Sequence, residues 1–205
     1  MAHTSDTRAR IMDVAQDAVL AKGFDATSIE EIVAGAEITK GGFFYHFKDK
    51  NELALSLIER HILVEDVLFD DLLARAAQLD DDPLHAALIF LKLLAELFDD
   101  MPKGHPGCIV ATAANQDRLF DARVHEANKR AALGWRDRFR KMFDGIAEVY
   151  PPNDQVEFEA LADFVSTVVE GALVMSRSLR DPSIAGRQVM VLRSYVKLLF
   201  TPRAH

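Results

Sequence analysis

Apolar residues recur along this chain at the three-to-four-residue spacing of amphipathic helices, and no segment alternates in the way that a half-buried strand does. The first stripe of apolar residues predicts a helix over residues 7–22. Gly23 followed by Phe24 is typical of a helix stop, in which a glycine ends the helix and an apolar residue folds back onto it.

A second, short helix begins at Thr27 or at Ser28, because each stands three positions before a glutamate and can complete a capping box. Gly35 ends this helix. Asp49, three positions before Glu52, opens a long helix that runs to about residue 78. We expect further helices from residue 83, from residue 108, and over about residues 119–148, 154–180 and 184–200.

The third helix is also short and contains two adjacent glycines. A glycine inside a helix costs about 1 kcal/mol relative to alanine, and a helix accepts two where a partner such as a phosphate or a base edge must come close to its backbone. Ile38, Phe43 and Phe47 form the inner side of this helix. Its exposed end carries Thr39, Lys40, Gly41, Gly42, Tyr45 and His46.

A helix, a turn and a short helix with a bare polar tip is the arrangement of a helix-turn-helix that reads DNA. The sequence therefore predicts an all-α protein of about nine helices. We expect residues 1–50 to form a three-helix DNA-binding head and residues 51–205 to form a helical body.

Charge restricts the DNA-binding prediction to one segment. The whole chain has a formal net charge of -8, which argues against a protein that coats nucleic acid non-specifically. Residues 38–50 differ, with three lysines against Asp49 alone. The single cysteine, Cys108, excludes an intrachain disulfide and suits a reducing compartment. No apolar run is long enough to span a membrane and the first residues are polar, so we expect a cytoplasmic protein.

The last two helices are apolar over more than one stripe. A helix with so wide an apolar surface has more to cover than its own core face, so we expect a homodimer through these helices; a thick monomer core is the alternative. Gly171 would let two helices cross closely. The expected dimer interface comprises Val165, Val169, Gly171, Ala172, Met175, Leu192, Val196 and Leu199.

Residues of about 8–55 resemble the TetR family of transcriptional regulators. The similarity is carried by the segment GlyPheAspAlaThrSerIleGluGluIle from Gly23 and by ThrLysGlyGlyPhePheTyrHisPheLysAspLysAsnGluLeu from Thr39. Gly42 and Phe44 depart from the family pattern, which often has a small hydroxyl residue and a tyrosine there. The resemblance implies double-stranded operator DNA as a partner. It implies DNA contacts for Thr27, Ser28, Thr39, Lys40, Gly41, Gly42, Phe44, Tyr45, His46 and Lys50, while Thr27 and Asp49 can instead serve only as helix caps.

Regulation in this family implies a small effector bound in the body. Trp135 is the foremost candidate because its N–H needs a partner that a ligand can supply. The segment around Cys108 resembles a Gly-Cys-Leu/Ile segment of members that respond to electrophiles or oxidants; the alternative is a small buried apolar residue. Asn115, Gln116 and His125 can orient a ligand or face solvent. The candidate pocket residues are Phe69, Phe90, Phe98, Met101, Cys108, Phe120, Trp135, Phe139 and Phe164.

Other classes of protein fit the sequence less well. The seven histidines are scattered, no HExxH motif occurs, and Cys108 has no base that the sequence defines, so we expect neither an enzyme nor a metal or other cofactor. His61 and Glu65 stand four residues apart, but two ligands do not make a metal site. A helical sensor or adaptor that binds no DNA would suit the acidic charge but leaves Gly41 and Gly42 unexplained. Arg8 and Arg10 can reach the DNA backbone or remain solvated.

Overall fold

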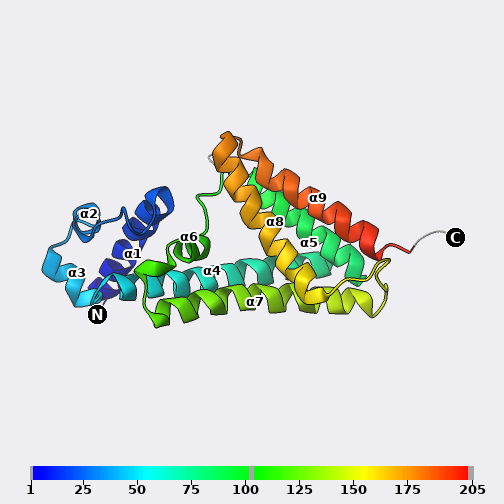
Figure 1. Cartoon of the computed structure of the whole chain (residues 1–205), viewed down its shortest axis with the longest axis horizontal. Helices are drawn as coiled ribbons and strands as arrows, with labels where there is room; N and C mark the ends of the chain where they lie inside the picture. Colours follow the sequence, from blue (N-terminus) through cyan, green and yellow to red (C-terminus); the bar gives the residue numbers. More distant parts are fainter. Residues whose placement is uncertain (1, 102–103, 203–205) are drawn as a thin grey trace. The chain divides into compact units, whose positions relative to one another are not determined.

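Figure 1 shows the computed structural model, which describes residues 2–101 and 104–202. All regular structure in these residues is helical: nine α-helices and one short 3₁₀ turn, without a strand. The predicted all-α fold is thereby confirmed. None of the described helices is at once long enough and apolar enough to span a membrane.

The first three helices are α1 (Ala2–Lys22), α2 (Ile29–Gly35) and α3 (Lys40–His46). Helix α1 begins five residues earlier than its apolar stripe predicts, because periodicity marks only the part of a helix that packs. Gly23 ends α1 with a positive φ of 90°, a conformation that glycine adopts without steric cost. Ser28 is the N-cap of α2 and accepts a hydrogen bond from the Glu31 N–H at 3.1 Å, which decides between the two predicted caps.

Two aspartates open the long central helices. Helix α4 spans Lys50–Leu79 and α5 spans Pro83–Asp99. Asp49 accepts a hydrogen bond from the Glu52 N–H at 2.9 Å, and Asp82 accepts one from the His85 N–H at the same distance. Both caps satisfy backbone N–H groups that the first turn leaves without a helical partner.

The remaining helices are α6 (Ile109–Asn115), α7 (Ala122–Ala147), α8 (Phe158–Leu179) and α9 (Ser183–Phe200), with the 3₁₀ turn η1 (Asp117–Leu119) before α7. Helix α7 begins three residues later than predicted because Asp121 caps it, accepting from the Val124 N–H at 3.3 Å. Helix α8 begins four residues later than predicted.

The chain divides into two compact units, and this division differs from the predicted boundary after residue 50. One unit comprises Met1–Val64 and Pro106–Ala131, and the other comprises Glu65–His105 and Ala132–His205. We call them the head unit and the body unit. Helix α6, which the sequence assigned to the body, packs on α1 within the head unit.

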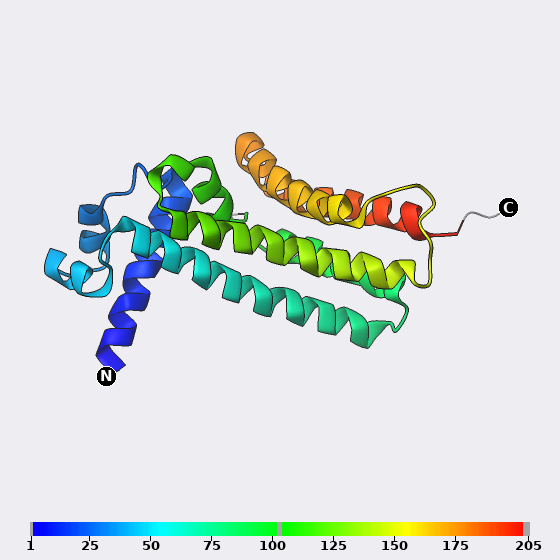
Figure 2. The same cartoon turned by 60° about the horizontal axis from the view of Figure 1, so that its bottom comes forward.

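The body unit is a helical bundle in which α9 lies against both α5 and α8, as Figures 1 and 2 show. Gly186 permits a close approach to α5, since a Cβ there would lie 2.3 Å from Asp99 Oδ1. Five residues predicted for a dimer interface are buried inside this bundle, so their side chains cannot reach a second protomer. These corrected residues are Val165, Ala172, Leu192, Val196 and Leu199.

The body unit also buries an acid. Oxygen Oε2 of Glu65 on α4 is shielded from solvent, and its carboxyl accepts a hydrogen bond from the Trp135 side chain. Burial, with a smaller effect from the charge of Glu170, raises the pKa of Glu65 to about 8 from an ordinary 4.5. Between these two values the folded chain holds a proton that the unfolded chain releases, so the free energy of unfolding falls as pH rises through this window.

We predict that Glu65→Gln removes this pH dependence, because glutamine keeps an acceptor for Trp135 but does not ionise. At pH 8 the variant should be the more stable protein by a few kcal/mol, on the order of 1.4 kcal/mol for each unit of pKa shift. The difference should shrink towards zero near pH 4.5. Thermal unfolding followed by circular dichroism at several pH values measures it. Glu96→Gln, at an exposed position on α5, is the matched control, and parallel pH curves for Glu65→Gln and the wild type would contradict the assignment.

Candidate functional site

Helix α3 separates its anchoring residues from its exposed ones. Phe43 and Phe47 are completely buried in the head unit, with ring centroids 5.8 Å apart. Tyr45 is 76% exposed, and Phe44 is exposed beside it. The His46 ring stands edge to face against Tyr45 at 5.0 Å. The short helix therefore exposes aromatic and polar groups on its outer side, while two buried phenyl rings anchor its inner side.

Two of the three serine and threonine residues predicted to contact DNA are available at this surface. The exposed Ser28 and Thr39 cap α2 and α3, and each hydroxyl oxygen accepts one backbone N–H, from Glu31 and Gly42 respectively. Each hydroxyl keeps its own hydrogen to donate. Thr27 does not fit its predicted DNA contact, because its side chain is 1% exposed and its hydroxyl donates to the Gly23 carbonyl at 2.8 Å.

The lysines of this surface are partly engaged. Lys40 forms an exposed ion pair with Glu30 at 2.8 Å, and this hydrogen bond is the main cause that lowers the pKa of Glu30. Lys50 donates to the Phe24 carbonyl at 2.9 Å, so it supports the head unit from within. Lys48 is exposed. The predicted phosphate contact of Lys40 requires exchange of a carboxylate for a phosphate, which an exposed pair permits at small cost.

Two arginines have structural contacts that the sequence did not reveal. The Arg8 guanidinium lies 4.9 Å from the centre of the Phe47 ring and donates to the Ser56 hydroxyl at 2.8 Å. Arg10 donates to the Ala36 carbonyl at 2.9 Å. Both arginines therefore hold α1 against the helix-turn-helix and its neighbour α4.

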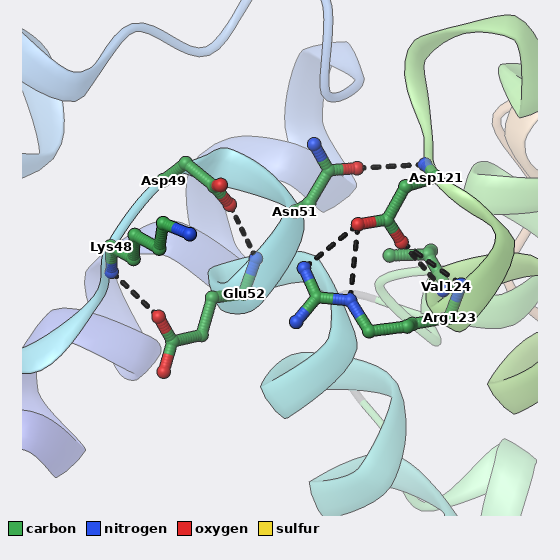
Figure 3. Close-up of polar contacts among 7 residues, drawn as sticks. All are labelled: Lys48, Asp49, Asn51, Glu52, Asp121, Arg123 and Val124. Atoms are coloured by element: carbon green, nitrogen blue, oxygen red, sulfur yellow. Dashed lines mark hydrogen bonds and ion pairs between the residues drawn. The ribbon is translucent and has the colours of Figure 1, made fainter.

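Figure 3 shows the polar contacts where α4 and α7 begin within the head unit. Lys48 N–H donates to Glu52, which completes the capping box opened by Asp49. Across from it, the Asp121 N–H donates to the Asn51 side chain at 2.9 Å. The Arg123 guanidinium pairs with Asp121 at 2.8 Å. These contacts join the start of α4, the helix that follows α3 in the sequence, to the start of α7.

The predicted pocket residues do not gather in one place. In the body unit, Phe69, Phe90 and Phe139 form a cluster with ring centroids about 6 Å apart. Phe98 packs in the same core and Trp135 lies against it, partly buried. Met101 is half-buried. These six remain candidates for a pocket wall.

Three other predicted pocket residues lie elsewhere. Phe120 packs edge to face on Phe24 in the head unit, at 4.9 Å. Phe164 is exposed on α8, where it contacts Tyr195 of α9. Cys108 belongs to the head unit and caps α6, and its Sγ lies 3.6 Å from Nε2 of His61. This base for the thiol could not be identified from the sequence, because the two residues are 47 positions apart. Among the described residues, no three His, Cys, Asp or Glu side chains are grouped as a metal site requires.

Comparison with known proteins agrees with this architecture. The sequence model of the family described as "Bacterial regulatory proteins, tetR family" matches residues 11–57. The chain is 24% identical over 200 residues to the uncharacterized HTH-type transcriptional regulator YxaF of Bacillus subtilis. This match covers 94% of this chain and 97% of YxaF. It is 32% identical over 60 residues to the HTH-type transcriptional repressor NemR of Escherichia coli, covering 29% of this chain and 30% of NemR.

The fold is shared with a TetR-family transcriptional regulator from Agrobacterium tumefaciens at a TM-score of 0.78. The sequences are 18% identical, and the match covers 97% of this chain and 100% of the other. The relatives that these comparisons name are transcriptional regulators and not enzymes.

Proposed function

Because this chain belongs to the TetR family of bacterial transcriptional regulators, we propose that it is a repressor that binds a palindromic operator as a dimer and releases it when a small effector binds. Helix α3 enters the major groove, as the second helix of a helix-turn-helix does. We infer the repressor role from the similarity to the HTH-type transcriptional repressor NemR, which is 32% identical to this chain over 60 residues. Since a bacterial operator lies in the cytoplasm, the protein works there.

The glycine pair of α3 is the observation that carries the proposal. A Cβ at Gly41 would meet only the Thr39 hydroxyl, at 3.8 Å, and a Cβ at Gly42 would meet that hydroxyl at 3.4 Å. Neither glycine has a positive φ. The fold itself therefore does not require glycine at Gly41, and an approaching DNA backbone supplies a reason for it. A sensor or adaptor that binds no DNA has no use for this bare helix tip.

Operator contacts follow from the groups exposed around this tip. Lys40 and the hydroxyls of Ser28 and Thr39 donate to phosphates and so fix the register of the head on the duplex. Phe44 packs on sugar or on a thymine methyl, and Tyr45 and His46 reach towards base edges or phosphates. Few cations take part, so correct geometry has to supply much of the affinity.

Dimerisation uses the outer surface of α8 and α9. The apolar side chains exposed there include Phe164, Val174, Met175, Val191, Tyr195 and Leu198. Gly171 stands among them with open space around its missing Cβ, as a close helix crossing would need. Exposed large apolar side chains gathered on two neighbouring helices are typical of an interface, and a twofold dimer presents two heads to a palindrome.

The effector binds in the body unit beside the aromatic cluster. Trp135 and the carboxyl of Glu65 provide a flat apolar wall with a polar group that can orient a ligand. The effector has to bind the released state more tightly than the DNA-bound state, since equal affinity shifts nothing. The second candidate signal is covalent: His61 stands beside the Cys108 thiol at 3.6 Å and can take up its proton when an electrophile attacks.

We predict that Gly41→Ala separates stability from DNA binding. Alanine should raise the free energy of unfolding by up to about 1 kcal/mol because it is the better helix former. It should nevertheless weaken operator binding several-fold, because its methyl group occupies the space of the DNA backbone. Thermal unfolding and fluorescence anisotropy on a duplex selected from a randomised library measure the two effects. Gly145→Ala on α7 is the matched control, since a Cβ there meets nothing within 4 Å. Undiminished binding by Gly41→Ala would remove the main support for the proposal.

Leu198→Glu should convert the dimer into folded monomers. Leu198 is 74% exposed in the protomer, so glutamate there leaves the bundle intact but places a charge within the proposed interface, which costs several kcal/mol when buried unpaired. Analytical ultracentrifugation at micromolar concentration measures the change. Leu79→Glu, another exposed leucine, controls for the added charge and should remain dimeric. A wild-type chain that sediments as a monomer rules out the proposed assembly.

Two substitutions distinguish the candidate signals. A panel of small aromatic compounds is first screened for those that release the wild type from the duplex. Trp135→Leu should abolish release by these compounds, while Cys108→Ser should leave it intact. Anisotropy of the labelled duplex reports release, and N-ethylmaleimide serves as the electrophile probe. If only N-ethylmaleimide releases the wild type and Cys108→Ser prevents it, the signal is covalent and the pocket assignment fails.

A further inference from the structure

The turn that joins α1 to α2 is held by a side chain from a distant part of the chain. Gln116 ends α6 as its C-cap, and its Oε1 accepts a hydrogen bond from the Phe24 N–H at 2.7 Å. Its Nε2 donates to the Asp25 carboxylate at 2.5 Å. Both ends of the amide are therefore used on one turn. The fit is tight, because a Cβ at Gly23 would lie 2.8 Å from Nε2.

Phe24, at the centre of this turn, is held by three contacts that come from two segments of the chain. Gln116 binds its N–H, Lys50 at the start of α4 donates to its carbonyl at 2.9 Å, and the Phe120 ring packs edge to face on its ring at 4.9 Å. Gln116 and Phe120 both belong to the short segment between α6 and α7. Because the N–H, the carbonyl and the ring of Phe24 are all in contact with other segments, the turn has little freedom to shift.

The position of this turn sets the position of the DNA-reading helices. The Thr27 hydroxyl donates back to the Gly23 carbonyl at 2.8 Å, which makes the turn continuous with the N-cap of α2 at Ser28. Helix α2 in turn packs on α3. Helix–DNA contacts depend on side chains being held within about 0.5 Å of their working positions, so a shift of the turn is passed to the tip of α3.

We propose that Gln116 is a positioning residue for operator binding, although it is 70 positions beyond the end of α3 and contacts no DNA itself. It locks the Gly23–Asp25 turn onto α6 and thereby fixes where α2 and α3 stand. This role rests on the proposed function, because it concerns the geometry of a head that reads DNA. It adds a residue outside the helix-turn-helix to the set that determines operator affinity.

A charge-exchange cycle tests the role. Gln116→Glu keeps an acceptor for the Phe24 N–H but turns a carboxylate oxygen towards the Asp25 carboxylate, so the second half of the contact becomes repulsive. Asp25→Asn in the same chain restores a donor opposite that oxygen. Asn115→Asp adds an equal charge at the neighbouring exposed position and is the matched control.

Operator affinity should fall about tenfold in Gln116→Glu and remain within about twofold of the wild type in Asn115→Asp. In the double variant, it should return to within about threefold of the affinity of Asp25→Asn. The slope of log affinity against log salt should stay unchanged in all of them, because no phosphate contact is lost. If Gln116 contributed only to stability, Gln116→Glu would lower the thermal unfolding midpoint. The operator affinity of the folded protein would then not fall in Gln116→Glu and recover in the double variant.

The outcomes separate the two proposals. If the wild type binds the selected duplex and Gln116→Glu binds like Asn115→Asp, or if Asp25→Asn does not rescue it, the positioning role is wrong and the proposed function stands. If the wild type selects no duplex at all, the proposed function is wrong and this role falls with it.

Discussion

A helix of seven residues is not stable alone in water, so α3 depends on the two phenyl rings that anchor it. Phe43 and Phe47 are completely buried, and the guanidinium of Arg8, a residue of α1, packs over the Phe47 ring. Every group of α3 proposed to touch DNA is positioned by this anchor. Because the buried rings supply the stability, the outer side of α3 is free to carry glycines and polar residues that a self-supporting helix would avoid.

The electrostatics of the head make its geometry more important. The chain is acidic overall, Lys40 faces Glu30, and Lys50 is bound to a backbone carbonyl. General attraction to the phosphate backbone is therefore weak, and a dimer gains affinity chiefly by placing two well-oriented heads at once. This is why the contacts that orient each head, among them the Gln116 contact with the turn after α1, carry functional weight in our account.

The sequence predicted what local chemistry decides. The helix cap at Asp49 and the stop at Gly23 depend on neighbours within a few residues, and both were confirmed. Contacts between distant positions were not predictable: Gln116 meets Asp25 from 91 positions away, and His61 meets Cys108 from 47. Periodicity also cannot tell an apolar face that covers its own core from one that covers a partner. For this reason Val165 and Leu192 were assigned to an interface although they lie in the core.

Selection from randomised DNA measures directly whether the heads of two protomers together read one specific DNA sequence. The purified wild-type chain is incubated with a library of randomised duplexes at physiological salt, and the bound fraction is amplified and sequenced over several rounds. We expect enrichment of an inverted repeat whose two half-sites are spaced for two copies of α3 in successive major grooves. Recovery of sequences without a common repeat, bound no more tightly than random DNA, would contradict it.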